Sequence, residues 1–128
     1  MRERPVVKHP HSEHLCPWFQ SAMDVLSKPW NGLIMAMLQT KGPLRFSELR
    51  AGLTAMGDRM LSERLKELEA RGLVLRRVEP GPPVRVGYAL TEAGQGFREV
   101  AMALSGWGKN FKPASGKPVR RRRPGKAA

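Results

Sequence analysis

The chain has 128 residues, which is enough for one domain with tails. Lys and Arg number 23 against 11 acids, so the net charge is +12; this favours a polyanionic partner such as nucleic acid, with general solubility as the plain alternative. The single cysteine excludes an intramolecular disulfide framework, and no apolar stretch has the length of a signal peptide or a membrane span. We therefore expect a cytoplasmic protein, associated with the nucleoid and not with a membrane.

The charge is distributed unevenly and divides the chain into three parts. Residues 1–14 hold two prolines and three histidines with little apolar content, as in a flexible arm, and residues 15–112 form the predicted folded domain. Residues 113–128 combine six bases with no acid, so we expect a disordered tail that raises DNA affinity without sequence preference, or that only solubilises the protein. Its bases are Lys117, Arg120, Arg121, Arg122, Arg123 and Lys126.

Two helices are predicted at the start of the domain. The first is short, from Trp18 to Leu26, with an apolar side. Pro29 suits the first turn of the second helix, which ends at the Gly42–Pro43 pair. The apolar positions of this second helix follow the spacing of one buried stripe, namely Trp30, Leu33, Ile34, Met37 and Leu38.

A helix-turn-helix pair comes next. A short helix over 46–53 is predicted to be capped by Ser47, and a turn over 52–57 leads into the clearest helix of the chain, over 58–71. That helix is rich in strong helix formers and ends before Gly72. Its predicted buried stripe is Leu61, Leu65 and Leu68.

The remaining pattern predicts a hairpin and a last helix. Residues 73–78 alternate as strand residues do and 84–90 can form the partner strand, with a turn or a rigid loop over 79–83 between them. Thr91 is expected to cap one final helix that runs past Trp107. The resulting fold class is mainly α with a small β-hairpin (α+β), that is, a winged helix-turn-helix in which the helix over 58–71 enters the major groove.

Several blocks of sequence resemble the HxlR-type helix-turn-helix family, which comprises bacterial regulators related to the MarR family. The blocks extend over about residues 16–108 and include Arg45-Phe46-Ser47-Glu48-Leu49, Met60-Leu61-Ser62-Glu63-Arg64-Leu65 and Leu90-Thr91-Glu92-Ala93-Gly94. The resemblance implies a sequence-specific transcriptional regulator that binds a near-palindromic promoter operator as a homodimer. It also implies a dimer interface built by the first and last helices, for which the candidates are Trp18, Phe19, Phe97, Leu104, Trp107 and Phe111.

The helix over 58–71 carries the candidate residues for reading double-stranded DNA. Arg59 can pair bidentately with guanine, Ser62 can meet a base or a phosphate, and Lys66 can hold a phosphate. Glu63 can accept from cytosine or restrain Arg59, and Arg64 can reach either a phosphate or an acid of the same chain. A solvated helix face is the alternative for each of them.

Further phosphate contacts are predicted from the hairpin and the helix before it. Arg76, Arg77 and Arg85 flank the hairpin tip, where a wing lies along the DNA backbone, although at least one of them is expected to be structural. Ser47 stands where helix N-terminal amides suit a phosphate, and Arg45 is a weaker candidate.

Cys16 has two possible roles, a sensor of a chemical signal and a residue of the core, and the sequence does not decide between them. In the family that the chain resembles, a cysteine at this place can sense oxidants or electrophiles, and a helix N-terminus favours the thiolate. The alternative is a small core residue. The histidines at 9, 11 and 14 lie nearby, but their spacing matches no strong metal signature, so we expect no metal and no cofactor.

An enzyme is not expected. The sequence has no phosphate-cradling glycine loop, no HExxH and no histidine within residues 15–112. The competing functional hypothesis is a nonspecific nucleoid or RNA-binding protein that depends on the basic tail.

Overall fold

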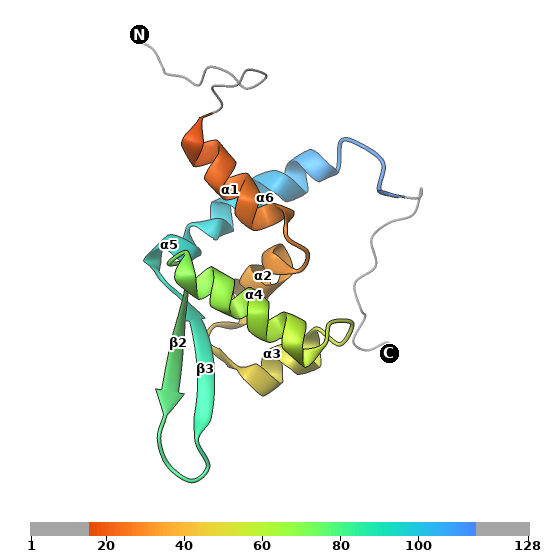
Figure 1. Ribbon diagram of the computed structural model, residues 1–128. Helices are drawn as coiled ribbons and strands as arrows, with labels where there is room; N and C mark the ends of the chain where they lie inside the picture. Colours follow the sequence, from red (N-terminus) through yellow and green to blue (C-terminus); the bar gives the residue numbers. More distant parts are fainter. Residues whose placement is uncertain (1–15, 115–128) are drawn as a thin grey trace.

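The computed structural model describes residues 16–114, and the arm over 1–14 and the tail bases from Lys117 onward lie outside them. Figure 1 shows a bundle of helices from which one hairpin projects. The helices are α1 (Pro17–Ser27), α2 (Asn31–Lys41), α3 (Phe46–Gly52), α4 (Asp58–Ala70), α5 (Glu92–Gln95) and α6 (Phe97–Gly108). The strands are β1 (Leu44–Arg45), β2 (Val74–Glu79) and β3 (Arg85–Leu90). The predicted class is confirmed: α3 and α4 form the helix-turn-helix, and β2 and β3 form the wing.

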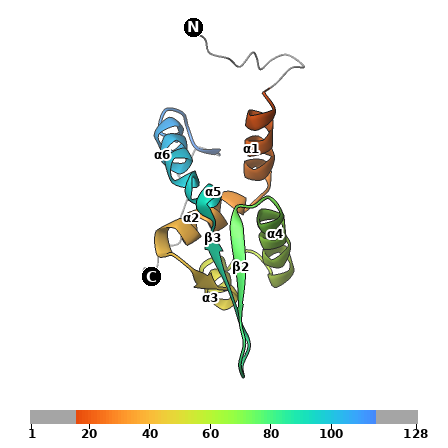
Figure 2. The same cartoon turned by 90° about the vertical axis from the view of Figure 1, so that its left-hand side faces the viewer.

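The sheet has one more strand than the sequence predicts. Its order is β1-β3-β2 with antiparallel neighbours, and the wing register runs from Val74 opposite Leu90 to Glu79 opposite Arg85. The two residues of β1 pair with Tyr88 and Gly87, which joins the entry of α3 to the root of the wing (Figure 2). The helix-turn-helix and the wing are therefore parts of one rigid arrangement.

The core lies between α2, α3, α4 and the sheet. The predicted stripe of α4 is confirmed, since Leu61, Leu65 and Leu68 are fully buried. Ile34 of α2 and Leu49 of α3 are buried against the same cluster. Burying such side chains contributes about 1.5–3 kcal/mol each, so this cluster sets the orientation of α4.

The second helix differs from its prediction. Trp30 adopts a left-handed backbone with φ 77°, and α2 begins only after it, at Asn31. The buried face consists of Asn31, Ile34, Met35 and Leu38, and Leu33 is 53% exposed. The predicted buried stripe was wrong at Leu33. It took Trp30 as the first helical residue, whereas the buried face of α2 starts at Asn31.

Helix caps also depart from expectation. Arg45, not Ser47, is the N-cap of α3, and its backbone N–H donates to Oε1 of Glu48 at 2.8 Å. Thr91 caps as predicted, because its hydroxyl accepts from the N–H of Gly94 at 3.0 Å. However, the last helix is divided at Gly96 into α5 and α6.

Over residues 16–114, none of the helices has both the length and the apolar character required to cross a membrane.

Candidate nucleic-acid interface

The solvent-facing side of α4 presents the side chains expected to read DNA. Arg59, Glu63 and Lys66 are exposed and Ser62 is half-buried. Among residues 16–114, neither Arg59 nor Lys66 forms a salt bridge, so both cations can meet an external anion.

Arg64 behaves differently from its neighbours. Its Nε donates to the carbonyl oxygen of Pro29 at 2.9 Å, its Nη1 lies 3.6 Å from Oε1 of Glu67, and its side chain is only 14% exposed. These contacts agree with the alternative of a partner within the chain, and a DNA contact of Arg64 stays a prediction.

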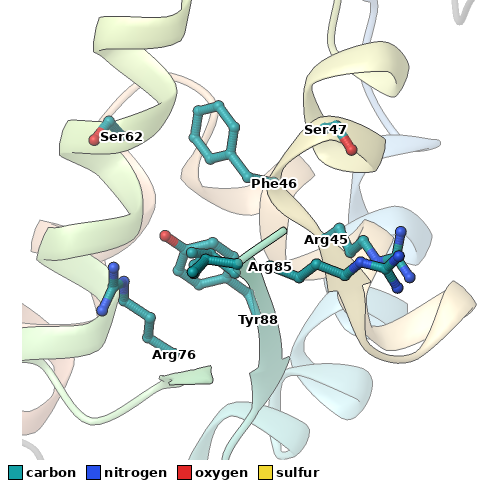
Figure 3. A pocket seen from close by; sticks show the side chains of 9 residues that line it. Arg45, Phe46, Ser47, Ser62, Arg76, Arg85 and Tyr88 are labelled. Carbon is teal, nitrogen blue, oxygen red and sulfur yellow. The ribbon is translucent and has the colours of Figure 1, made fainter. Parts of the chain in front are cut away.

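A groove of about 450 Å³ opens between the N-terminal end of α3, the middle of α4 and the root of the wing (Figure 3). It brings together five residues that were predicted separately from the sequence. None of the residues that line it is acidic. The lining consists of Arg45, Phe46, Ser47, Ser62, Arg76, Val84, Arg85, Val86 and Tyr88.

The groove has a cationic rim and an aromatic floor. Figure 3 shows Arg76 on the α4 side of Tyr88, and Arg45 with Arg85 on the α3 side. None of these three arginines forms a salt bridge within the described part of the chain. Hydrogen bonds from guanidinium and hydroxyl groups to phosphate are charge-assisted and strong, so the groove has the chemistry to hold a segment of sugar–phosphate backbone.

Phe46 and Tyr88 form the floor of the groove, and neither was predicted from the sequence. In the sequence, the alternation of strand residues 84–90 indicates that Tyr88 is a core residue. In the structure its side chain is only 8% exposed, yet it also lines the groove. The signal that could have found it is its position opposite Leu44, which requires knowledge of β1.

Polar contacts attach α4 to the N-terminal part of the domain. Nζ of Lys28 lies 2.6 Å from Oε2 of Glu67, and this hydrogen bond, together with the charge of Lys28 and then that of Arg64, lowers the pKa of Glu67. Burial of the carboxyl group opposes that shift. At the end of α4, Nη2 of Arg71 donates to the carbonyl oxygen of Ser21 at 3.0 Å. Sequence reasoning missed these contacts because about 40 to 50 residues separate the partners.

The predicted dimer residues lie on α1 and α6, except Phe111, which follows α6; the two helices are at the end of the molecule away from the wing tip (Figures 1 and 2). Trp18 is 79% exposed and Trp107 is 63% exposed, and the rings of Trp107 and Phe111 contact each other at a tilt of 58°, with centroids 4.9 Å apart. Phe97 differs, because it is buried in the core of its own protomer.

Cys16 immediately precedes α1 and is half-buried. Its carbonyl oxygen accepts the first hydrogen bond of the helix, from Gln20 at 3.0 Å. It lies outside the buried core cluster, so the structure does not favour the alternative of a core residue.

Comparison with known proteins agrees with this architecture. The model of the HxlR-like helix-turn-helix family matches residues 25–115. The HTH-type transcriptional regulator YvaP of Bacillus subtilis is 44% identical over 97 residues, which cover 76% of this chain and 89% of YvaP. The reduced form of the regulator YodB of B. subtilis superimposes with a TM-score of 0.70 at 42% identity, covering 76% of this chain and 94% of YodB. Quinone-bound YodB gives a TM-score of 0.68 at 39% identity, with 76% and 100% covered.

The wing, the groove beside α4 and these similarities agree on one class of protein. The chain belongs to the HxlR-like helix-turn-helix family and is a DNA-binding transcriptional regulator, not an enzyme.

Proposed function

We propose that the protein acts in the cytoplasm as a homodimer that binds a near-palindromic promoter operator, with the two α4 helices in successive major grooves. The observation that carries this proposal is the acid-free groove beside the exposed face of α4. In a dimer the two recognition helices lie about 34 Å apart, one turn of DNA.

Each exposed residue of α4 has a distinct role in this proposal. Arg59 lies in the first turn and reads guanine through two hydrogen bonds, and Ser62 contacts a base or phosphate beside the groove. Lys66 binds a phosphate, and Glu63 either accepts from cytosine or holds Arg59. Arg45, Ser47, Arg76 and Arg85 position the backbone between α4 and the wing.

Base reading can be tested by selecting bound sequences from random DNA with wild-type protein and two variants. Arg59→Ala is expected to lose about 1–3 kcal/mol of discrimination at one base pair of each half-site, while Lys66→Ala weakens all sequences alike. Arg98→Ala, which removes an exposed arginine from α6, is the matched control for the change in charge. Equal weakening on every sequence by Arg59→Ala would contradict the placement of α4.

Deleting residues 113–128 distinguishes this proposal from the competing hypothesis, a nonspecific binder that depends on the tail. A regulator keeps its operator preference and loses affinity and salt dependence, whereas a tail-driven binder loses binding altogether.

The dimer is supported by the large apolar side chains that α1, α6 and the residues just after α6 expose to solvent, since exposed apolar surface often marks a protein–protein contact. They are Trp18, Phe19, Leu104, Trp107 and Phe111. Replacing Trp107 with Glu is expected to convert the dimer to a monomer, as measured by light scattering during gel filtration, and to lower operator affinity. An unchanged mass would remove α6 from the interface.

Cys16 is proposed as an electrophile sensor, supported by its position at the start of α1 and by the similarity to quinone-bound YodB. Its sulfur adds to a ring CH carbon of a quinone and forms a C–S bond. The thiol proton goes to one ring oxygen and the proton of the attacked ring carbon moves to the other, which gives the hydroquinone thioether. A quinone or diamide is expected to weaken operator binding by the wild type and not by Cys16→Ser. If Cys16→Ser binds normally and still responds, the sensor lies elsewhere.

A further inference from the structure

A row of residues across the three strands places two arginines on either side of a glycine. Gly87 of β3 is directly opposite Arg45 of β1 on one side and Arg77 of β2 on the other. Directly opposite residues in antiparallel strands point to the same face of the sheet, with Cα atoms about 4.5–5.5 Å apart. The Cα atoms of the two arginines are thus about 10 Å apart, with no side chain between them.

This row lies on the outer face of the sheet. The neighbouring positions Val74 and Tyr88 point to the other face, where they are buried against the helices. The register therefore separates the consecutive wing arginines. Arg76 shares the face of Tyr88 and lines the groove, and Arg77 points away from it.

The outer face carries a concentrated positive charge. Arg85 stands two residues before Gly87 on the same strand and so adds a third cation to this face, where its directly opposite neighbour is Glu79. Within residues 16–114, none of Arg45, Arg77 and Arg85 forms a salt bridge, with Glu79 or with any other acid. The three positive charges are therefore not neutralised within the described domain.

Neither packing nor backbone conformation requires glycine at position 87. A Cβ atom built there would have one neighbour within 4 Å, the carbonyl oxygen of Leu44 at 3.6 Å, which is ordinary contact, and the φ of Gly87 is not in the left-handed range. Glycine inside a strand weakens the strand, and it often marks a place where a ligand or another backbone approaches closely. The gap between the two arginines is thus open to an external anion.

We propose that Arg45, Gly87, Arg77 and Arg85 form a second phosphate-binding surface, which seats a DNA backbone segment on the face of the wing opposite the groove. This inference rests on the proposed operator binding. Arg45 and Arg85 also line the groove, so the two surfaces are continuous. Their shared positive charge favours one duplex as the occupant of both. The wing then lies between two backbone segments, held by Arg76 on one face and by Arg77 on the other.

A charge placed in the gap tests this proposal. Gly87→Glu puts a carboxylate between Arg45 and Arg77, and Gly87→Gln adds a side chain of nearly the same size without charge. Both variants are titrated with the operator selected from random DNA and with a scrambled duplex, at several salt concentrations. Far-UV circular dichroism melts confirm that both are folded.

The expected difference between the two variants follows from counterion release. Removing one ion pair between the protein and a phosphate lowers the slope of log K against log salt by about 0.9, which corresponds to roughly eightfold weaker binding at about 0.1 M salt. Gly87→Glu acts in both protomers of the dimer, so relative to Gly87→Gln its slope should fall by about 1.8 and its binding should weaken roughly 60-fold at about 0.1 M salt, by the same factor on both duplexes. Arg77→Gln should lower the slope by the equivalent of about one phosphate per protomer.

Two results overturn the proposal: equal affinity and salt slope for the two Gly87 variants, or a weakening confined to the operator, which would place the row against bases. Failure of the operator-binding proposal is a separate result. It would appear as wild-type protein that selects no sequence, while the comparison of the Gly87 variants on scrambled DNA would still test the phosphate surface.

Discussion

Gly94 in α5 is the position where the smallest substitution should do the most damage. A Cβ atom built there would lie 2.1 Å from the carbonyl oxygen of Leu73 and 3.0 Å from Cδ2 of Leu90. Cβ atoms in real structures essentially never come within 3.0 Å of such a neighbour, so the backbone must move by about 0.9 Å. The same carbonyl accepts from the N–H of Thr91 at 3.0 Å, which ties the root of the wing to the start of α5.

The magnitude of the Gly94→Ala effect follows from two costs and one gain. Overpacking costs about 1–3 kcal/mol, and weakening the Thr91 hydrogen bond costs about 0.5–1.5 kcal/mol. The helical preference of Ala over Gly returns up to about 1 kcal/mol. The free energy of unfolding should therefore fall by about 0.5–4.5 kcal/mol, and a central value of about 2.5 kcal/mol lowers the melting temperature by roughly 10–20 °C for a domain of this size.

The matched control is Gly32→Ala in α2, where a built Cβ has nothing within 4 Å. This variant should be neutral or more stable by up to about 1 kcal/mol. Both variants are measured by urea and thermal unfolding at one fixed protein concentration. Equal stability of the Gly94 and Gly32 variants would refute the steric reasoning.

Three further predictions concern the contacts that hold α1, α2 and α4 in place. Glu67→Gln should remove the stabilisation from the hydrogen bond with Lys28. Because the pKa of Glu67 is lowered on folding, that stabilisation is present above pH 4.5 and disappears as the pH falls through the folded-state value, so wild type and variant should converge in acid unfolding curves. Asn31→Asp should destabilise more at pH 8 than at pH 5, since it places a carboxylate in a buried site whose amide donates to the carbonyl oxygen of Val25 at 2.9 Å; a pH-independent effect would count against this. Leu61→Ala should cost about 2–5 kcal/mol in urea unfolding, because Leu61 is fully buried, and a cost below about 1 kcal/mol would show that α4 is not anchored as described.

The strongly patterned elements were predictable from sequence, and α4 is the clearest case. Its leucines repeat at one helical spacing among polar residues, so only one face can be buried, and the structure confirms it. The alternation of the wing strands, with Pro and Gly between them, was equally informative.

The failures arose where local pattern is weak or tertiary contact decides. Helix α2 is apolar on nearly every side, so its periodicity could not select a face, and the left-handed turn at Trp30 shifted the start of the count. The strand β1 is two residues long and exists only through pairing with β3. The sequence left Arg64 open between a phosphate and an acid of the same chain, and local pattern could not identify the carbonyl oxygen of Pro29, 35 residues away in sequence, as its hydrogen-bond acceptor.

At the candidate site, the sequence allowed a prediction of which basic residues could contact DNA. It did not allow a prediction of which of them lie on the same face of the domain. Basic residues beside a helix-turn-helix could be selected from the sequence. The division of Arg76 and Arg77 between two faces required the strand register, and the role of Gly87 required its two neighbours across the sheet.

Helix α1 buries none of its own side chains completely, and its attachment to α4 relies on polar contacts such as that of Arg71 with Ser21. Such a helix has little intrinsic resistance to opening. If its apolar side is covered by a second protomer, its order becomes a function of protein concentration. Each tenfold dilution above the dissociation constant then removes about 0.7 kcal/mol of protection, because the fraction of monomer rises with the square root of the dilution. Amide hydrogen exchange along α1 should then accelerate on dilution while exchange in α4 stays slow. The order of the helix that follows Cys16 would thus depend on the concentration of the regulator.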